Sequence, residues 1–232
     1  MTELTDLQAV EACNEESTNT SPATVHTAPR VVLVGMPGSG KSTIGRRIAS
    51  ALNLPIMDSD LLIEQAEGKA CGEVYAELGE DAFRELEVGF VARALATGGV
   101  VSLGGGAIVT EEVRQLLQRH TVVWIDVSAE EGIRRTAQDS TRPVLDSDDR
   151  EQRYRDLMDQ REPLYREVAT FRVRTDARPP QRVVAEILGF IDGEEFPSGF
   201  SSVKRRSKQW QWYPSRAQVR TAFILAAITL TP

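Results

Sequence analysis

The chain has 232 residues, 41% of them hydrophobic and 26% charged, and its 34 acidic residues outnumber 27 basic ones for a net charge of −7. That length suits one compact domain with extensions, and the apolar share argues against a disordered, collagen-like or disulfide-scaffold chain. An acidic domain is also a poor general binder of nucleic acid, because phosphate contacts need an excess of Lys and Arg.

Cysteine content and hydropathy set the expected compartment. Cys13 and Cys71 are the two cysteines, with no CxxC or Cys/His cluster, so neither a disulfide framework nor a zinc site is expected. The N-terminus lacks the basic start and apolar core of a secretory signal, and no apolar run approaches the roughly 20 residues that span a bilayer. We therefore expect a cytoplasmic protein without a membrane or nucleic-acid partner.

The N-terminal part of the chain predicts a leader followed by a strand and a helix. Residues 1–29 contain five acidic residues, no Lys or Arg and no apolar period, which indicates a disordered acidic leader. Val31–Val34 is a short, wholly apolar run typical of a buried strand. Apolar residues at helical spacing follow over 44–52, so a strand, a glycine-rich loop and a helix are expected in that order.

The same alternation continues to the C-terminal part of the chain. Further strands are predicted over 54–57, 100–103, 121–125 and 171–173. Helices are predicted over 83–95 and 113–117, after a capping box formed by Ser128 and Glu131, and from Pro180 onward. Alternating helices and wholly apolar strands predict an α/β fold, with a five-stranded parallel sheet covered by helices on both faces. Binding sites in such sheets lie at the carboxyl ends of the strands.

The pattern changes in residues 191–232. From residue 196 onward this tail has six basic residues and no acidic one, and it ends in an apolar run from Ala222 to Leu230. We expect an appendage to the fold without an assigned role. The weaker alternative is a nucleic-acid or membrane patch built on Trp210 and Trp212 among the basic residues.

Residues 35–43, GMPGSGKST, fit the pattern G-x-x-x-x-G-K-[ST] between a strand and a helix. Glycines let the backbone curl so that its N–H groups and the helix N-terminus face a polyphosphate. Lys41 would place its charge on the β- and γ-phosphates, and the Ser42 hydroxyl would ligate Mg²⁺. A chance glycine-rich turn is the alternative, which the flanking strand and helix disfavour. The expected ATP-binding residues of this P-loop are Gly38, Ser39, Gly40, Lys41, Ser42 and Thr43.

Asp58 and Asp60 follow the second predicted strand, which puts two carboxylates at the sheet edge beside the P-loop. Asp58 would hold Mg²⁺ through water, and Asp60 would accept a hydrogen bond from a substrate hydroxyl. Without the P-loop, a helix N-cap and a solvated side chain would be the better explanation of this pair.

Six motifs together resemble those of the shikimate kinases in order and approximate spacing, from about Val31 to Leu188. They are residues 35–42, Asp58-Ser59-Asp60, Phe83-Arg84 with Glu87, Gly104-Gly105-Gly106, Arg142-Pro143 with Leu145, and Arg161 to Tyr165. P-loop kinases at large do not share the last five. The resemblance implies a three-layer P-loop kinase fold over 30–190, with a substrate-binding helical region at about 58–87 and a lid at about 137–149. It also implies that ATP, with one Mg²⁺, phosphorylates the 3-hydroxyl of shikimate in the route to chorismate and the aromatic amino acids.

The resemblance further implies which residues bind shikimate. Arg84 and Arg161 would hold its carboxylate, since the guanidinium fork matches a planar carboxylate. Asp60 would orient the attacking hydroxyl and accept its proton, and the backbone of Gly105 and Gly106 would contact ring oxygens. The alternatives are that Arg84 forms an ordinary ion pair on its own helix and that the three glycines are only a turn.

The resemblance assigns the remaining cations to the nucleotide. Arg142 in the lid would act with Lys41 on the transferring phosphoryl group, where an arginine finger contributes about 10³ to 10⁵ in rate. A surface ion pair in an Asp-rich loop is the alternative for Arg142. Arg135, and Arg178 with Pro180, resemble positions that flank adenine, although Thr175 lies near where many members carry an Asp after the strand.

Two other functions stay open from the sequence. A gluconate kinase or an adenylate kinase would share the P-loop, but would leave Arg84, the three glycines and Arg161 without a task. A nucleotide- or shikimate-binding module without turnover is the alternative from another class. The presence of every expected catalytic and metal residue argues against that module: Lys41, Ser42, Asp58, Asp60 and Arg142. We expect a monomer whose partners are shikimate and ATP.

Overall fold

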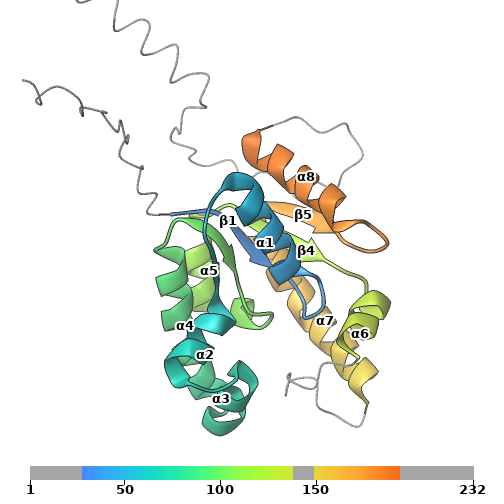
Figure 1. Ribbon diagram of the computed structural model, residues 1–232. Helices are drawn as coiled ribbons and strands as arrows, with labels where there is room; N and C mark the ends of the chain where they lie inside the picture. Colours follow the sequence, from blue (N-terminus) through green and yellow to red (C-terminus); the bar gives the residue numbers. More distant parts are fainter. Residues whose placement is uncertain (1–27, 138–148, 194–232) are drawn as a thin grey trace, which may run out of the picture.

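A five-stranded parallel sheet forms the centre of the fold (Figure 1). The computed structural model describes residues 28–137 and 149–193. In spatial order the strands are β2 (Ile56–Asp58), β3 (Gly99–Ser102), β1 (Pro29–Val34), β4 (Val122–Asp126) and β5 (Phe171–Arg174). Because each pairing is parallel, all five strands end at one edge of the sheet. The predicted α/β fold with a five-stranded parallel sheet is confirmed.

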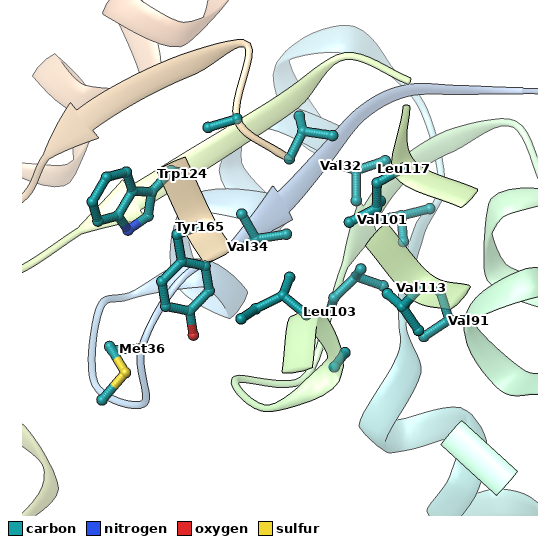
Figure 2. Packing of buried hydrophobic residues seen from close by; sticks show 14 of the residues in the cluster. Val32, Val34, Met36, Val91, Val101, Leu103, Val113, Leu117, Trp124 and Tyr165 are labelled. Atoms are coloured by element: carbon teal, nitrogen blue, oxygen red, sulfur yellow. The ribbon is translucent and has the colours of Figure 1, made fainter. Parts of the chain in front are cut away.

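Helices cover both faces of the sheet. On one face α1 (Lys41–Leu52) and α8 (Pro180–Asp192) pack Ile48 and Ile187 against Val31 and Leu33. On the other face α4 (Glu80–Leu95), α5 (Glu111–Leu117) and α7 (Arg150–Val168) surround a cluster that includes Trp124 (Figure 2). Since successive side chains of a strand point to opposite faces, covering both faces requires a wholly apolar central strand.

The segment between β2 and β3 builds a smaller unit beyond the strand ends. Two short helices, α2 (Ser59–Glu67) and α3 (Cys71–Leu78), lie against α4 and project away from the sheet (Figure 1). The buried side chains of this unit form a separate cluster of Ile63, Val74, Phe83 and Phe90. It coincides with the substrate-binding helical region expected at about 58–87.

The remaining elements connect the sheet to the expected lid. The 3₁₀ helix η1 (Ala107–Val109) follows the glycine triplet, and α6 (Ala129–Thr136) follows β4. Asp149 caps α7, its Oδ1 accepting from the Gln152 N–H at 2.9 Å. Most of the lid expected at 137–149, including Arg142, lies outside the described residues, as do residues 1–27 of the leader and nearly all of the tail.

Several boundaries differ from the sequence prediction. The second strand begins at Ile56 instead of 54, because Pro55 has no N–H for the ladder and contributes only its carbonyl, to the Val100 N–H at 2.9 Å. Asp58 ends the strand instead of following it, because the pairing with β3 continues to Asp58 and Ser102. The first strand begins at Pro29, within the expected leader, and α8 continues to Asp192, past the expected domain end at 190.

The capping box predicted for α6 is only half formed. The Ser128 Oγ accepts from the Glu131 N–H at 3.3 Å, as expected of an N-cap. The Ser128 N–H, however, donates to Asp176 Oδ1 at 2.9 Å, and the Glu131 carboxylate accepts from Arg134 and Arg135. A carboxylate 48 residues away along the chain thus replaces the local partner.

The sequence analysis expected neither a membrane-spanning helix nor a disulfide framework, and the described residues bear on both points. Among residues 28–137 and 149–193 no helix is long and apolar enough to cross a bilayer. Cys71 has a free thiol there, and its burial raises the pKa of that thiol to about 12, which leaves it protonated and unreactive at neutral pH.

Candidate active site

The P-loop between β1 and α1 turns its carbonyl groups outward. Gly38 and Gly40 have φ values of 77° and 96°, which L side chains rarely adopt, and this lets the loop curl onto the start of α1. Every carbonyl from residue 35 to 40 accepts a hydrogen bond. The donors are Lys41 Nζ to Gly35 (2.7 Å) and Met36 (3.1 Å), Tyr154 Oη to Pro37 (2.8 Å), Arg135 Nη1 to Gly38 (3.2 Å), Thr175 Oγ1 to Ser39 (3.2 Å) and the Ile44 N–H to Gly40 (2.9 Å). The Ser39 N–H donates to the Met36 carbonyl at 3.2 Å, while the N–H groups of the first turn of α1 are left for an anion.

The two oxygens of Asp58 have different partners. Oδ1 accepts from the Asp60 N–H at 3.1 Å and caps α2, while Oδ2 lies 3.5 Å from the Ser42 hydroxyl. The N-cap explanation and the metal explanation of this residue are therefore compatible. Hydroxyl and carboxylate oxygens are ligands that Mg²⁺ accepts, so Ser42 and Asp58 fit that ion. The described residues contain no group of three or more His, Cys, Asp or Glu side chains that could hold a metal ion.

Asp60 lies directly against the glycine triplet that follows β3. A Cβ added at Gly104 would collide with Asp60 Oδ1 and would lie 3.2 Å from Glu87 Oε1. The neighbouring Ser59 is fully buried, and its Oγ accepts from the Gly104 N–H at 2.9 Å. Glycine at 104 is therefore needed for the close approach of loop and carboxylate, and Asp60 is held at the edge of this loop.

Arg84 and Arg161 approach the same loop from two helices. The Arg84 guanidinium is packed against Gly106, where an added Cβ would lie 2.7 Å from both Nη1 and Nη2. Arg161 Nη1 donates to the Gly105 carbonyl at 3.2 Å. Arg84 also pairs with Glu87 at 2.6 Å, so the ion pair considered from the sequence does form. It is a buried pair, however, because Glu87 is only 2% exposed.

Two guanidinium groups and two carboxylates share this loop. Arg84 and Arg161 lie with the buried carboxylate of Glu87 and the partly buried one of Asp60, while Glu80, 3.7 Å from Arg84, is 61% exposed and screened by solvent. Burial lowers the pKa of Arg161, and the Arg84 Nε is buried without a hydrogen-bond partner among the described residues. Two guanidinium groups at one loop, one of them with an unused N–H, suit a ligand that carries a carboxylate.

Burial of Glu87 makes the folding stability of the protein depend on pH. Burial raises the pKa of Glu87, while the charges of Arg84 and Arg161 oppose the rise less strongly. The folded protein therefore binds more protons than the unfolded chain between the unfolded value, about 4.3, and the raised one. The stability from this group is fully present below the unfolded pKa and is lost as the pH rises through the folded pKa.

We expect Glu87→Gln, which cannot ionise, to become more stable relative to the wild type as the pH rises from about 4 to 8. Denaturant unfolding of both proteins across that range measures the difference. A difference that stays constant with pH would contradict a raised pKa of Glu87.

The cations predicted to flank adenine separate into two groups. Arg135 lies at the P-loop, because it donates to the Gly38 carbonyl at 3.2 Å. It also bonds the Thr175 side chain at 3.2 Å and the Glu131 carboxylate at 2.7 Å. Arg178 instead pairs with Glu186 of α8 at 2.5 Å, and Pro180 is the first residue of that helix. Thr175, at the position where the sequence departs from the family pattern, still bonds the P-loop through Ser39.

Three residues without a role predicted from the sequence contact these loops: Ser59, Tyr154 and Tyr165. Tyr165 Oη donates to the Gly105 carbonyl at 2.6 Å, and Tyr154 Oη donates to the Pro37 carbonyl at 2.8 Å. Tyr154, Arg161 and Tyr165 are spaced by seven and then four residues, which puts their polar tips on one face of a helix. That spacing is the signal from which the two tyrosines could have been found; Ser59 offers none.

Comparisons with known proteins match the part of the chain that holds these loops. The family model described as shikimate kinase matches residues 37–192. A shikimate kinase of Corynebacterium efficiens is 65% identical over 166 residues, which is 72% of this chain and 98% of that protein. One of Corynebacterium glutamicum is 61% identical over 164 residues, 71% of this chain and 97% of that protein. Among solved structures, shikimate kinase from Acinetobacter baumannii in complex with shikimate has a TM-score of 0.68 at 35% identity, covering 71% of this chain and 92% of that one.

Proposed function

The chain belongs to the shikimate kinase family, and from this premise we propose how its own residues phosphorylate shikimate. The reaction transfers a phosphoryl group from ATP to the 3-hydroxyl of shikimate. One observation carries the assignment of the site. Asp60, Arg84 and Arg161 come from three helices and meet at the loop 104–106, directly beside the P-loop.

The two loops touch each other through Pro37 and Gly105. A Cβ added at Gly105 would lie 2.9 Å from the Pro37 Cδ. The phosphates of a nucleotide bound to the P-loop would therefore lie next to a shikimate bound at the glycine loop. Phosphoryl transfer depends mainly on such positioning and on stabilisation of charge, because the transition state is loose.

We assign the acceptor's carboxylate to Arg84 and Arg161. The meeting of the two guanidinium groups at one loop and the unused Arg84 Nε support this role. Asp60 orients the 3-hydroxyl and accepts its proton, and the backbone of Gly105 and Gly106 contacts the ring oxygens. Asp60 and Arg84 lie in close contact with the glycine triplet. This closeness supports a ligand that contacts both the backbone of the loop and these two side chains.

The nucleotide binds to the P-loop residues Gly38 to Thr43. Lys41 contacts its β- and γ-phosphates, and Arg135 lies beside the loop. Ser42 and, through water, Asp58 would hold Mg²⁺. When bound, this ion neutralises charge on the phosphate oxygens. Arg142 is assigned to the transferring phosphoryl group, and Arg178 with Pro180 to the base; these three roles rest on the resemblance. We place this ATP-consuming monomer in the cytoplasm, with residues 30–190 as its catalytic domain.

The experiment that tests this function is ADP release by the purified full-length protein with MgATP. Shikimate, gluconate, AMP and no acceptor are compared at equal concentration. Release that depends on shikimate alone is expected. AMP has no carboxylate for Arg84 and Arg161, and the open chain of gluconate does not hold its carboxylate and hydroxyls at the fixed separation that a ring gives. Release with gluconate or AMP would overturn the roles of the two arginines. Silence with every acceptor would favour the binding module without turnover.

A further inference from the structure

Helix α7 carries two buried tyrosines whose hydroxyls bond to two different loops of the site. Tyr154 Oη donates to the Pro37 carbonyl of the P-loop at 2.8 Å, and Tyr165 Oη donates to the Gly105 carbonyl of the glycine loop at 2.6 Å. Both side chains are only 1% exposed. We propose that they are separate positioning residues: Tyr154 orients the P-loop for the nucleotide, and Tyr165 orients the glycine loop for shikimate.

The geometry of the peptide group explains how a hydroxyl at the back of a loop acts on a ligand at its front. In a planar trans peptide the carbonyl and the following N–H point in opposite directions. A hydrogen bond that holds the Pro37 carbonyl outward therefore aims the Gly38 N–H into the P-loop. In the same way, the hydrogen bond from Tyr165 to the Gly105 carbonyl turns the Gly106 N–H away from that tyrosine and fixes its direction.

The place of the Tyr154 hydroxyl is kept free by Gly132 of α6. A Cβ added at Gly132 would collide with the Tyr154 Oη and would lie 2.5 Å from its Cζ. Glycine inside a helix is less favourable than alanine. The chain thus has a helix-weakening residue at the one place where the hydroxyl needs room to reach Pro37. Tyr154 is in this way enclosed between α6 and the P-loop.

Tyr165 is fixed in a similar manner on the other side of the loops. Its ring stacks on Trp124 with centroids 5.8 Å apart and 19° between the planes. Figure 2 shows its hydroxyl pointing away from Trp124, toward Met36 and Leu103, the residues next to the two loops. Burial raises the pKa of Tyr165, so the phenol stays protonated and remains a donor. Arg161 Nη1 supplies a second donor to the same carbonyl at 3.2 Å.

The test compares Tyr154→Phe with Tyr165→Phe in the full chain, and each serves as the control for the other. Both changes remove one hydroxyl and keep the ring, on the same helix. The measurements are KM and kcat for each substrate, calorimetric dissociation constants for MgADP and for shikimate without turnover, and the melting temperature. This inference rests on the proposed function, so shikimate-dependent ADP release by the wild type is measured first.

We expect Tyr154→Phe to raise the KM of MgATP and the dissociation constant of MgADP about five- to tenfold, the effect of one hydrogen bond, with shikimate values within about twofold. Tyr165→Phe is expected to raise the KM and the dissociation constant of shikimate by the same factor and to leave the nucleotide values within about twofold. Equal effects on both ligands, or lower melting temperatures with unchanged affinities, would mean that the hydroxyls only stabilise the fold and would overturn the inference. If the wild type released no ADP with shikimate, the proposed function would be refuted instead. Calorimetry with MgADP would then still test whether Tyr154 orients the P-loop for the nucleotide.

Discussion

Replacing Asp60 with Asn is expected to lower kcat by about 10²- to 10⁴-fold, the usual contribution of a general base. Asn has the shape of Asp but cannot accept the proton of the attacking hydroxyl. Because the side chain keeps its place against Gly104, KM for both substrates is expected to change much less than kcat. Steady-state kinetics of the purified variant with MgATP and shikimate measure both quantities.

A matched control for this change is Asp81→Asn. Asp81 is an exposed acidic residue in the first turn of α4, so the same loss of charge there is expected to leave kcat at the wild-type value. A third variant, Gly104→Ala, keeps the carboxylate but forces it to move, since the new Cβ would collide with Asp60 Oδ1. We expect it to lower kcat as well. Near-normal turnover by Asp60→Asn would refute the assignment of this carboxylate.

Lys41→Met is the second change from which a large effect is expected. Met keeps the length and the apolar stem of the side chain but removes the ammonium that we assign to the β- and γ-phosphates. Loss of one preorganised positive donor at developing charge costs about 10²- to 10³-fold in kcat. Because Lys41 Nζ also donates to the Gly35 and Met36 carbonyls, nucleotide affinity is expected to fall as well. Single-turnover kinetics and calorimetry with MgADP separate the two effects.

Arg47→Met is the matched control on the same helix. Arg47 is exposed on α1 and carries the same charge, so its replacement is expected to leave turnover unchanged. If Lys41→Met and Arg47→Met differed by less than about tenfold in kcat, a distinct role of the Lys41 ammonium would be ruled out.

Much of the fold was predictable because its signals are local. Val31–Val34 is apolar throughout, as a strand covered on both faces must be, and Pro180 begins α8 where its missing N–H costs nothing. Boundaries were less predictable. Asp58 was expected after a strand and instead ends it, because its pairing with Ser102 of the neighbouring strand extends the ladder by one residue.

The candidate site was predictable in its members more than in their contacts. The motifs named Asp60, Arg84 and Arg161, and the structure brings all three to one loop, although their chemical roles stay predictions. Arg142 lies outside the described residues, so its role also stays a prediction. Arg178 was assigned to the nucleotide, yet its guanidinium pairs with Glu186 of α8.

The amino-acid sequence by itself determined the P-loop motif and the order of the five strands, since each depends on residues close together in the chain. The resemblance of separate motifs named the charged residues that we propose for the site. The tertiary structure alone decided that Ser59 holds Gly104 and that Tyr154 holds Pro37, across 45 and 117 residues. It also decided that Glu87 is buried and that Asp176 replaces Glu131 at the start of α6. Hydrogen bonds are short and directional, so distant partners can be identified only after the packing of the helices on the sheet has set their positions.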